Sequence, residues 1–127
     1  MDSIIYPMSV HVMFIALLYA LLTIARAPKV WNIGTYKNTW QKLEPRISAN
    51  LANQFEWPVL FYVVSVLLHI KGIESQVTIG LAWLFCFGRL LHSLVQIFTE
   101  NIRLRGVIFT INFLAVLAMW YCLMAGM

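Results

Sequence analysis

Charged side chains are scarce in this sequence. Only 11% of its 127 residues are charged, whereas about a quarter are charged in an ordinary soluble domain. Hydrophobic residues make up 61% of the chain and recur in long stretches along almost its whole length. This composition argues against a water-soluble fold. We expect residues 1–127 to form a single membrane domain without a separate soluble module.

Recognisable cysteine and basic motifs are also missing. The two cysteines, Cys86 and Cys122, lie inside apolar runs without the spacing of zinc or redox sites, so we expect buried thiols and no metal site. The net charge of +4 comes from cations spread over short connections, which form no basic patch that would indicate nucleic acid. No small-residue cleavage site precedes Arg26, so we expect the first apolar run to remain in the protein.

Four apolar runs are each long enough to cross the roughly 30 Å of bilayer hydrocarbon, which takes about 20 helical residues. We place these helices near residues 4–26, 46–70, 77–99 and 106–126. Because the second and third connections are short, neighbouring helices should be antiparallel. The sequence therefore predicts an all-α membrane protein, an antiparallel bundle of four transmembrane helices. Pro58 should kink the second helix just after Glu56, since proline removes a backbone hydrogen bond.

Basic residues indicate the orientation of the chain in the membrane. They gather in the first and third connections and their flanks: Arg26, Lys29, Lys37, Lys42 and Arg46, then Arg103 and Arg105. Short positive connections stay in the cytoplasm, so we expect both termini to face away from it. The short connections and the lack of retention signals favour a bacterial inner membrane.

Two of the predicted helices carry polar residues at membrane depth. On the second, a shared flank holds Arg46, Asn50, Asn53 and Glu56, while Gln54 is expected near the interface. On the third, a single arc holds Arg89, His92, Ser93, Gln96, Thr99, Glu100 and Arg103. A charged group at the bilayer centre costs at least ~2.5–3.5 kcal/mol, so these side chains should face protein or water and have partners.

One interpretation of these polar residues is a Glu56–Arg89 ion pair that only fixes helix packing. The cations at this level outnumber the carboxylates, however, which favours a binding site for an anion. A guanidinium binds a carboxylate through two parallel hydrogen bonds, and the Glu56 carboxylate can accept an ammonium. A small zwitterion with additional negative charge, such as glutathione, fits this arrangement.

Two segments resemble the signatures of one family. Asn53-Gln-Phe-Glu56-Trp-Pro58-Val-Leu-Phe is similar to the second-helix signature of the membrane-associated proteins in eicosanoid and glutathione metabolism, the MAPEG family, which includes microsomal glutathione transferases. The series Arg89-x-x-His92-Ser93, followed by Asn101-x-x-x-Arg105-Gly106, resembles the other signature. The resemblance covers essentially the whole chain.

This resemblance implies a homotrimer that binds glutathione between subunits, near the cytoplasmic side, and joins it to a lipophilic electrophile or hydroperoxide from the bilayer. The implied glutathione-binding residues are Arg26, Arg46, Asn50, Asn53, Glu56, Arg89, His92 and Gln96. Arg105 is the implied catalytic residue, with Arg103 as the alternative. A nearby cation lowers the pKa of the glutathione thiol and so favours the nucleophilic thiolate.

The sequence departs from the family pattern at positions that matter for catalysis. Catalytic members commonly carry an arginine where this chain has Ala49, and often tyrosines where it has Trp57 and Gln96. These differences leave open a non-catalytic lipid-binding or scaffold protein of the same fold. A third hypothesis is a small four-helix exporter, which would exchange protons for cationic drugs at a single membrane-embedded glutamate. Here that glutamate would be Glu56, and the arginines around it would repel a cationic drug. Haem ligation by His11 and His69 is a further alternative.

Overall fold

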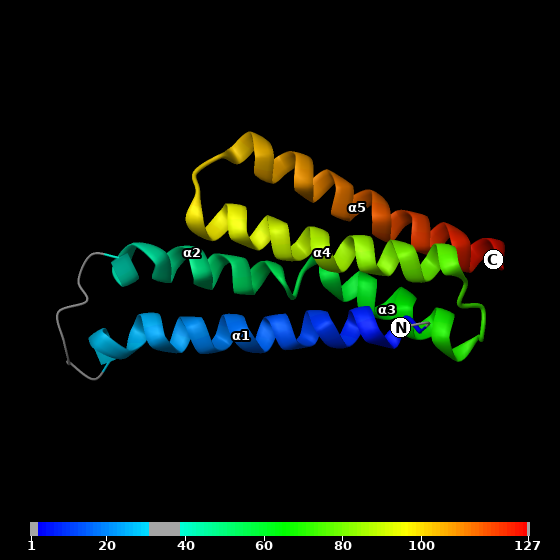
Figure 1. Ribbon diagram of the computed structural model, residues 1–127, viewed down its shortest axis with the longest axis horizontal. Helices are drawn as coiled ribbons and strands as arrows, with labels where there is room; N and C mark the ends of the chain where they lie inside the picture. Colours follow the sequence, from blue (N-terminus) through cyan, green and yellow to red (C-terminus); the bar gives the residue numbers. More distant parts are fainter. Residues whose placement is uncertain (1–2, 31–38, 127) are drawn as a thin grey trace.

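The computed structural model describes residues 3–30 and 39–126, with side chains described for residues 3–27 and 42–126. Over these ranges the protein is entirely helical and contains no strand. Its helices are α1 (Ile5–Val30), α2 (Thr39–Asn53), α3 (Trp57–Ile70), α4 (Gln76–Phe98) and α5 (Ile102–Ala125) (Figure 1). The predicted all-α class is therefore confirmed.

Four stretches within the described residues are long and apolar enough to cross a membrane: Ile5–Ala27, Lys42–Ile70, Gln76–Phe98 and Ile102–Ala125. The second combines α2 and α3. Two helices begin before the predicted residues, because hydropathy detects the apolar part of a helix and not its polar first turns. Thus α2 begins at Thr39, ahead of residue 46, and α5 begins at Ile102, ahead of residue 106, with the Asn101 side chain accepting a hydrogen bond from the Leu104 amide.

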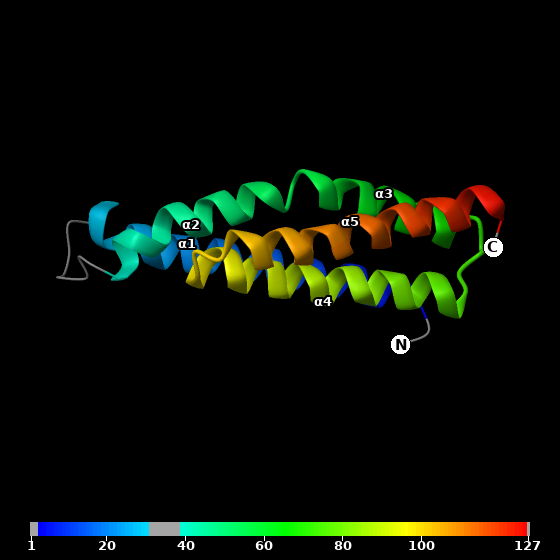
Figure 2. The same cartoon turned by 90° about the horizontal axis from the view of Figure 1, so that it is seen from above.

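A break at residues 54–56 separates α2 from α3 (Figure 2). The amides of Phe55 and Glu56 donate to carbonyls three residues earlier, which is a tighter pattern than that of an α-helix. Pro58 follows at the start of α3, where its missing N–H leaves the Gln54 carbonyl without its usual helical donor. The expected kink is therefore a full interruption, and it lies on the N-terminal side of Pro58.

The helices form an elongated bundle whose connections alternate between its ends (Figures 1 and 2). The start of α1 and the end of α5 lie at the same end of the bundle as the α3–α4 connection (Figure 1). Helix α4 packs against α1, α2 and α5, and α1 packs against α2, α3 and α4. The helix that carries the longer polar series, α4, therefore contacts three others.

The buried residues form two apolar clusters separated by polar side chains. The first cluster consists of Ile4, Phe61, Val64, Leu68, Ala82, Phe85, Ala115, Val116 and Met119. The second consists of Leu18, Leu22, Ala25, Ile47, Leu51 and Ile97. Between them along the chain lie the buried polar residues His11, Gln54, Arg89, His92 and Ser93, and Asn50 lies within the second cluster beside them. A buried polar group must be hydrogen-bonded or facing a ligand to be tolerated, so this layer is where a site is to be sought.

Glu74 connects the start of the first span to the end of the second. Its Oε1 atom accepts a hydrogen bond from the Ile4 amide at 3.2 Å and from the Ser3 hydroxyl at 3.5 Å. The same oxygen pairs with His69 Nδ1 at 2.9 Å. A carboxylate at a helix N-terminus satisfies a free amide and interacts favourably with the helix dipole. The α3–α4 connection thus caps the start of α1.

Candidate functional site

A cavity of about 200 Å³ lies beside the break between α2 and α3. Its lining residues are Asn53, Glu56, Trp57, Arg89, His92 and Phe109. Arg89 and His92 project from the same face of α4 because they are three residues apart, and both are buried. Glu56 and Phe109 are exposed. The cavity therefore has a buried basic floor and an acidic group at its exposed side.

Three buried nitrogen atoms around this cavity have no hydrogen-bond partner among the described residues. They are Arg89 Nη2, His92 Nδ1 and Trp57 Nε1. The guanidinium and the indole can only donate, so the group that would satisfy them must accept hydrogen bonds. A buried donor left unpaired costs roughly 1–3 kcal/mol. The arrangement is suited to an anionic acceptor.

Glu56 does not neutralise Arg89 directly. The ion pairs within the described part of the chain are Arg26–Glu44, Arg46–Glu100 and His69–Glu74. The interpretation of Glu56 and Arg89 as a plain packing ion pair is therefore wrong. The reason is local: α3 starts at Trp57, so the direction of Glu56 is set by the break and not by the turn of α2.

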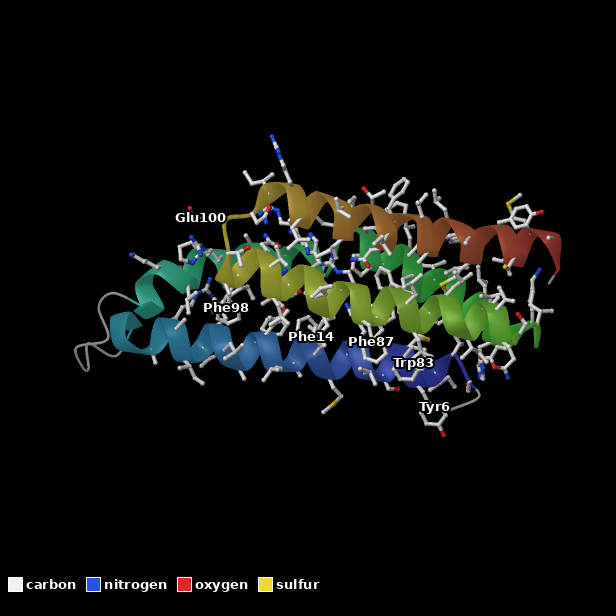
Figure 3. All side chains as sticks on the ribbon, turned by 45° about the horizontal axis from the view of Figure 1, so that its top comes forward. Tyr6, Phe14, Trp83, Phe87, Phe98 and Glu100 are labelled. Carbon is white, nitrogen blue, oxygen red and sulfur yellow. The ribbon has the colours of Figure 1, made fainter. Side chains whose placement is uncertain are left out.

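A larger cavity, of about 520 Å³, lies toward the α4–α5 connection. It is lined by Pro45, Arg46, Ala49, Gln96, Thr99, Glu100, Ile102 and Arg105. Arg46 Nη2 pairs with Glu100 Oε1 at 2.7 Å, and its Nη1 donates to the Ile97 carbonyl at 3.3 Å. Glu100, which Figure 3 shows beside that connection, is 86% exposed. Arg105 has no ion-pair partner among the described residues, so this cavity also retains a free cation.

Side-chain amides connect the two cavities. Gln96 Oε1 accepts from Asn50 Nδ2 at 2.8 Å and from Asn53 Nδ2 at 3.2 Å. Gln54 Nε2 lies 3.1 Å from Asn50 Oδ1 and 3.2 Å from Ser93 Oγ. Gln96 lines the larger cavity and Asn53 the smaller one, so a hydrogen bond joins the linings of the two cavities.

Comparison with known families gives a single result. The model of the MAPEG family matches residues 4–125, which is nearly the whole chain. The chain belongs to the MAPEG family. No curated protein and no solved structure matched it. Family membership and four apolar helices together indicate a multi-pass integral membrane protein, and the family includes glutathione transferases and related proteins.

The predicted site residues of this MAPEG chain fall into three groups. Asn53, Glu56, Arg89 and His92 line the smaller cavity. Arg46, Gln96 and Arg105 line the larger one. Asn50 is buried in the amide network, and Arg26 pairs with Glu44 Oε1 at 2.8 Å outside both cavity linings.

Two expectations about arginines need correction. Arg103 and Arg105 were expected in the third connection, but both lie in the first turns of α5, because Asn101 starts that helix. Arg105 lines the larger cavity, whereas the exposed Arg103 lines neither of the two. Of these two arginines, Arg105 is therefore the one placed to contact a molecule in the larger cavity.

Sequence reasoning missed two residues of the buried network. Gln54 was expected near the interface, yet it is only 1% exposed. His11 was considered only as a haem ligand, yet its Nε2 lies 2.9 Å from Gln54 Oε1 and its Nδ1 contacts the Tyr62 hydroxyl. The available signal was that residues 4–25 contain no Asp, Glu, Lys or Arg, and that His11 is their only histidine.

Proposed function

We propose that this protein is a glutathione-dependent membrane transferase or peroxidase. In this proposal four antiparallel spans form each subunit of a homotrimer, and glutathione binds between subunits near the cytoplasmic side. Both termini face away from the cytoplasm, and the membrane is a bacterial inner membrane. Glutathione is the co-substrate, and the second substrate is a lipophilic compound that enters from the bilayer.

The observation that carries the proposal is the set of unpaired nitrogen atoms around the smaller cavity. Arg89, His92 and Trp57 offer nitrogens without partners among the described residues, and Glu56 lies on the same lining. An α-amino acid end suits these groups, with its carboxylate toward the donors and its ammonium toward Glu56. At about 200 Å³ the cavity is smaller than the ~300–1,000 Å³ of most small-molecule sites, so the rest of the tripeptide extends beyond it.

Arg105 has the catalytic role in this proposal. Its guanidinium stabilises the thiolate of glutathione, and the thiolate sulfur is the nucleophile. With an electrophile that carries a leaving group, a carbon–sulfur bond forms as the leaving group departs with its electron pair. With a hydroperoxide, two glutathione molecules are oxidised to their disulfide while the peroxide is reduced to an alcohol and water.

Calorimetric titration of glutathione into the detergent-purified protein tests this proposal. Glu56→Gln should weaken binding at least about tenfold, because it removes the charge that pairs with the ammonium. Glu74→Gln is the matched control, since it removes the same charge outside both cavities and should leave the affinity unchanged. Arg105→Ala should still bind glutathione but should lose the ultraviolet absorbance of the thiolate. Absence of binding heat at millimolar glutathione would refute the proposal.

A second function, that of a non-catalytic lipid-binding or scaffold protein, is favoured by Ala49. This small residue lines the larger cavity next to Arg46, where catalytic relatives commonly add a cation. Assays of glutathione conjugation to chlorodinitrobenzene and of cumene hydroperoxide reduction distinguish the two functions. Turnover of either substrate favours the enzyme. Glutathione binding with turnover of neither substrate favours the scaffold.

A further inference from the structure

Gln54 makes the densest set of side-chain hydrogen bonds in the described part of the chain. Its Oε1 accepts from His11 Nε2 at 2.9 Å and from Arg89 Nε at 3.4 Å. Its Nε2 donates toward Asn50 and Ser93. All the donor and acceptor capacity of the amide is therefore in use, and the side chain has one orientation that satisfies its neighbours.

The contacts of Gln54 also indicate which ring nitrogen of His11 carries the hydrogen. Because Gln54 Oε1 can only accept, His11 Nε2 must carry a hydrogen, and in the neutral ring Nδ1 is then the acceptor. The Tyr62 hydroxyl contacts Nδ1 and supplies that hydrogen. The chain of donors runs from Tyr62 through His11 to Gln54, and it joins α3 and α1 to the break.

The hydrogen-bonded series Tyr62–His11–Gln54 contacts Arg89 at only one of its nitrogens. Its Nε faces Gln54, while its Nη2 has no partner in the described residues and belongs to a side chain that lines the smaller cavity. Arg89 is 1% exposed, so its position depends on the protein around it. The partner at Nε is a neutral amide, and no carboxylate among the described residues forms a direct ion pair with Arg89, although Glu56 lines the same cavity.

We infer that Gln54, oriented by His11, is a positioning residue that fixes Arg89 in the smaller cavity while leaving its charge available to an anionic ligand. This inference rests on the proposed function, and it adds a requirement to it. Residue 54 must be neutral as well as hydrogen-bonding. A carboxylate there would hold Arg89 equally well but would compete with the ligand for the same cation.

Gln54→Glu separates these two requirements. The variant keeps an oxygen for Arg89 and His11, and the Ser93 hydroxyl can rotate to donate to the other oxygen, while the two Asn50 oxygens lose their donor. Glutathione affinity should fall at least about tenfold, while the thermal midpoint stays above that of Gln54→Leu, which loses every contact. Gln76→Glu, an exposed position at the start of α4, adds the same charge elsewhere and should bind as the wild type does. Wild-type affinity in Gln54→Glu would overturn the inference.

A second readout does not require glutathione to bind. In protein labelled with nitrogen-15 arginine, the Nε–H resonance of Arg89 is identified by its disappearance in Arg89→Lys. This proton should exchange slowly with solvent in the wild type and faster in both Gln54→Leu and His11→Phe. If the wild type binds no glutathione, the proposed function fails, and the exchange experiment still decides the positioning role. Unchanged exchange in both variants would refute that role.

Discussion

Gly88 and Gly80 lie on the same helix, α4, in very different surroundings. A Cβ atom added at Gly88 would lie 1.8 Å from Asn112 Oδ1, whereas one added at Gly80 would meet nothing within 4 Å. Asn112 is fully buried on α5, so it has little room to move away. Small residues permit such close approach between membrane helices.

We predict that Gly88→Ala destabilises the protein by about 1–3 kcal/mol, as overpacking does in a tightly packed interior. Gly80→Ala should be neutral or stabilising by about 0.5–1 kcal/mol, because alanine favours the helix more than glycine does. Thermal unfolding in detergent measures both changes. The double variant Gly88→Ala/Asn112→Ala should recover part of the loss. An equal effect of the two alanines would contradict the close α4–α5 contact.

At the scale of the element, the break between α2 and α3 depends on Pro58. An alanine there removes the clash of the proline ring with the preceding turn and restores a donor for the Gln54 carbonyl. We predict that Pro58→Ala makes α2 and α3 more continuous and lowers glutathione affinity, because Gln54 and Glu56 change direction.

Spin labels at Ala52 and Val66, both exposed, measure this change as a shift in their distance distribution. The labels require a chain whose buried Cys86 and Cys122 are replaced by alanine. Pro7→Ala is the control: Pro7 lies in the first turn of α1, where a missing N–H breaks no helical bond, so the distances should stay the same. An unchanged distribution in Pro58→Ala would show that the break has another origin.

The break also explains how far the sequence could predict the structure. The four apolar stretches were predictable because crossing the bilayer requires a minimum helical length. The grouping of Arg89 with His92 was predictable because α4 is continuous and spacing defines a face. Gln54 was not predictable in this way. Spacing arguments treat residues 46–70 as one helix, and once α2 ends at Asn53 they no longer determine where the next side chains point.

At the scale of the whole molecule, large apolar side chains remain exposed on α1, α3, α4 and α5. The side chains with the largest exposed fractions include Met13, Ile70, Ile102, Tyr121 and Met124. A surface of this kind is suited to lipid or to other subunits. We predict that native mass spectrometry of the protein in mild detergent gives three times the chain mass of 14.6 kDa. A monomeric mass at concentrations where glutathione binds would contradict a site shared between subunits.

The cap that Glu74 provides for α1 has a consequence for membrane insertion. The acceptor for the Ile4 amide lies about 70 residues later in the chain, after the second span. During synthesis from the N-terminus, the first span therefore enters the bilayer before its cap has been made. Its first turn acquires these hydrogen bonds only after the α3–α4 connection has been made, so the first helix is completed after the second span has been synthesised.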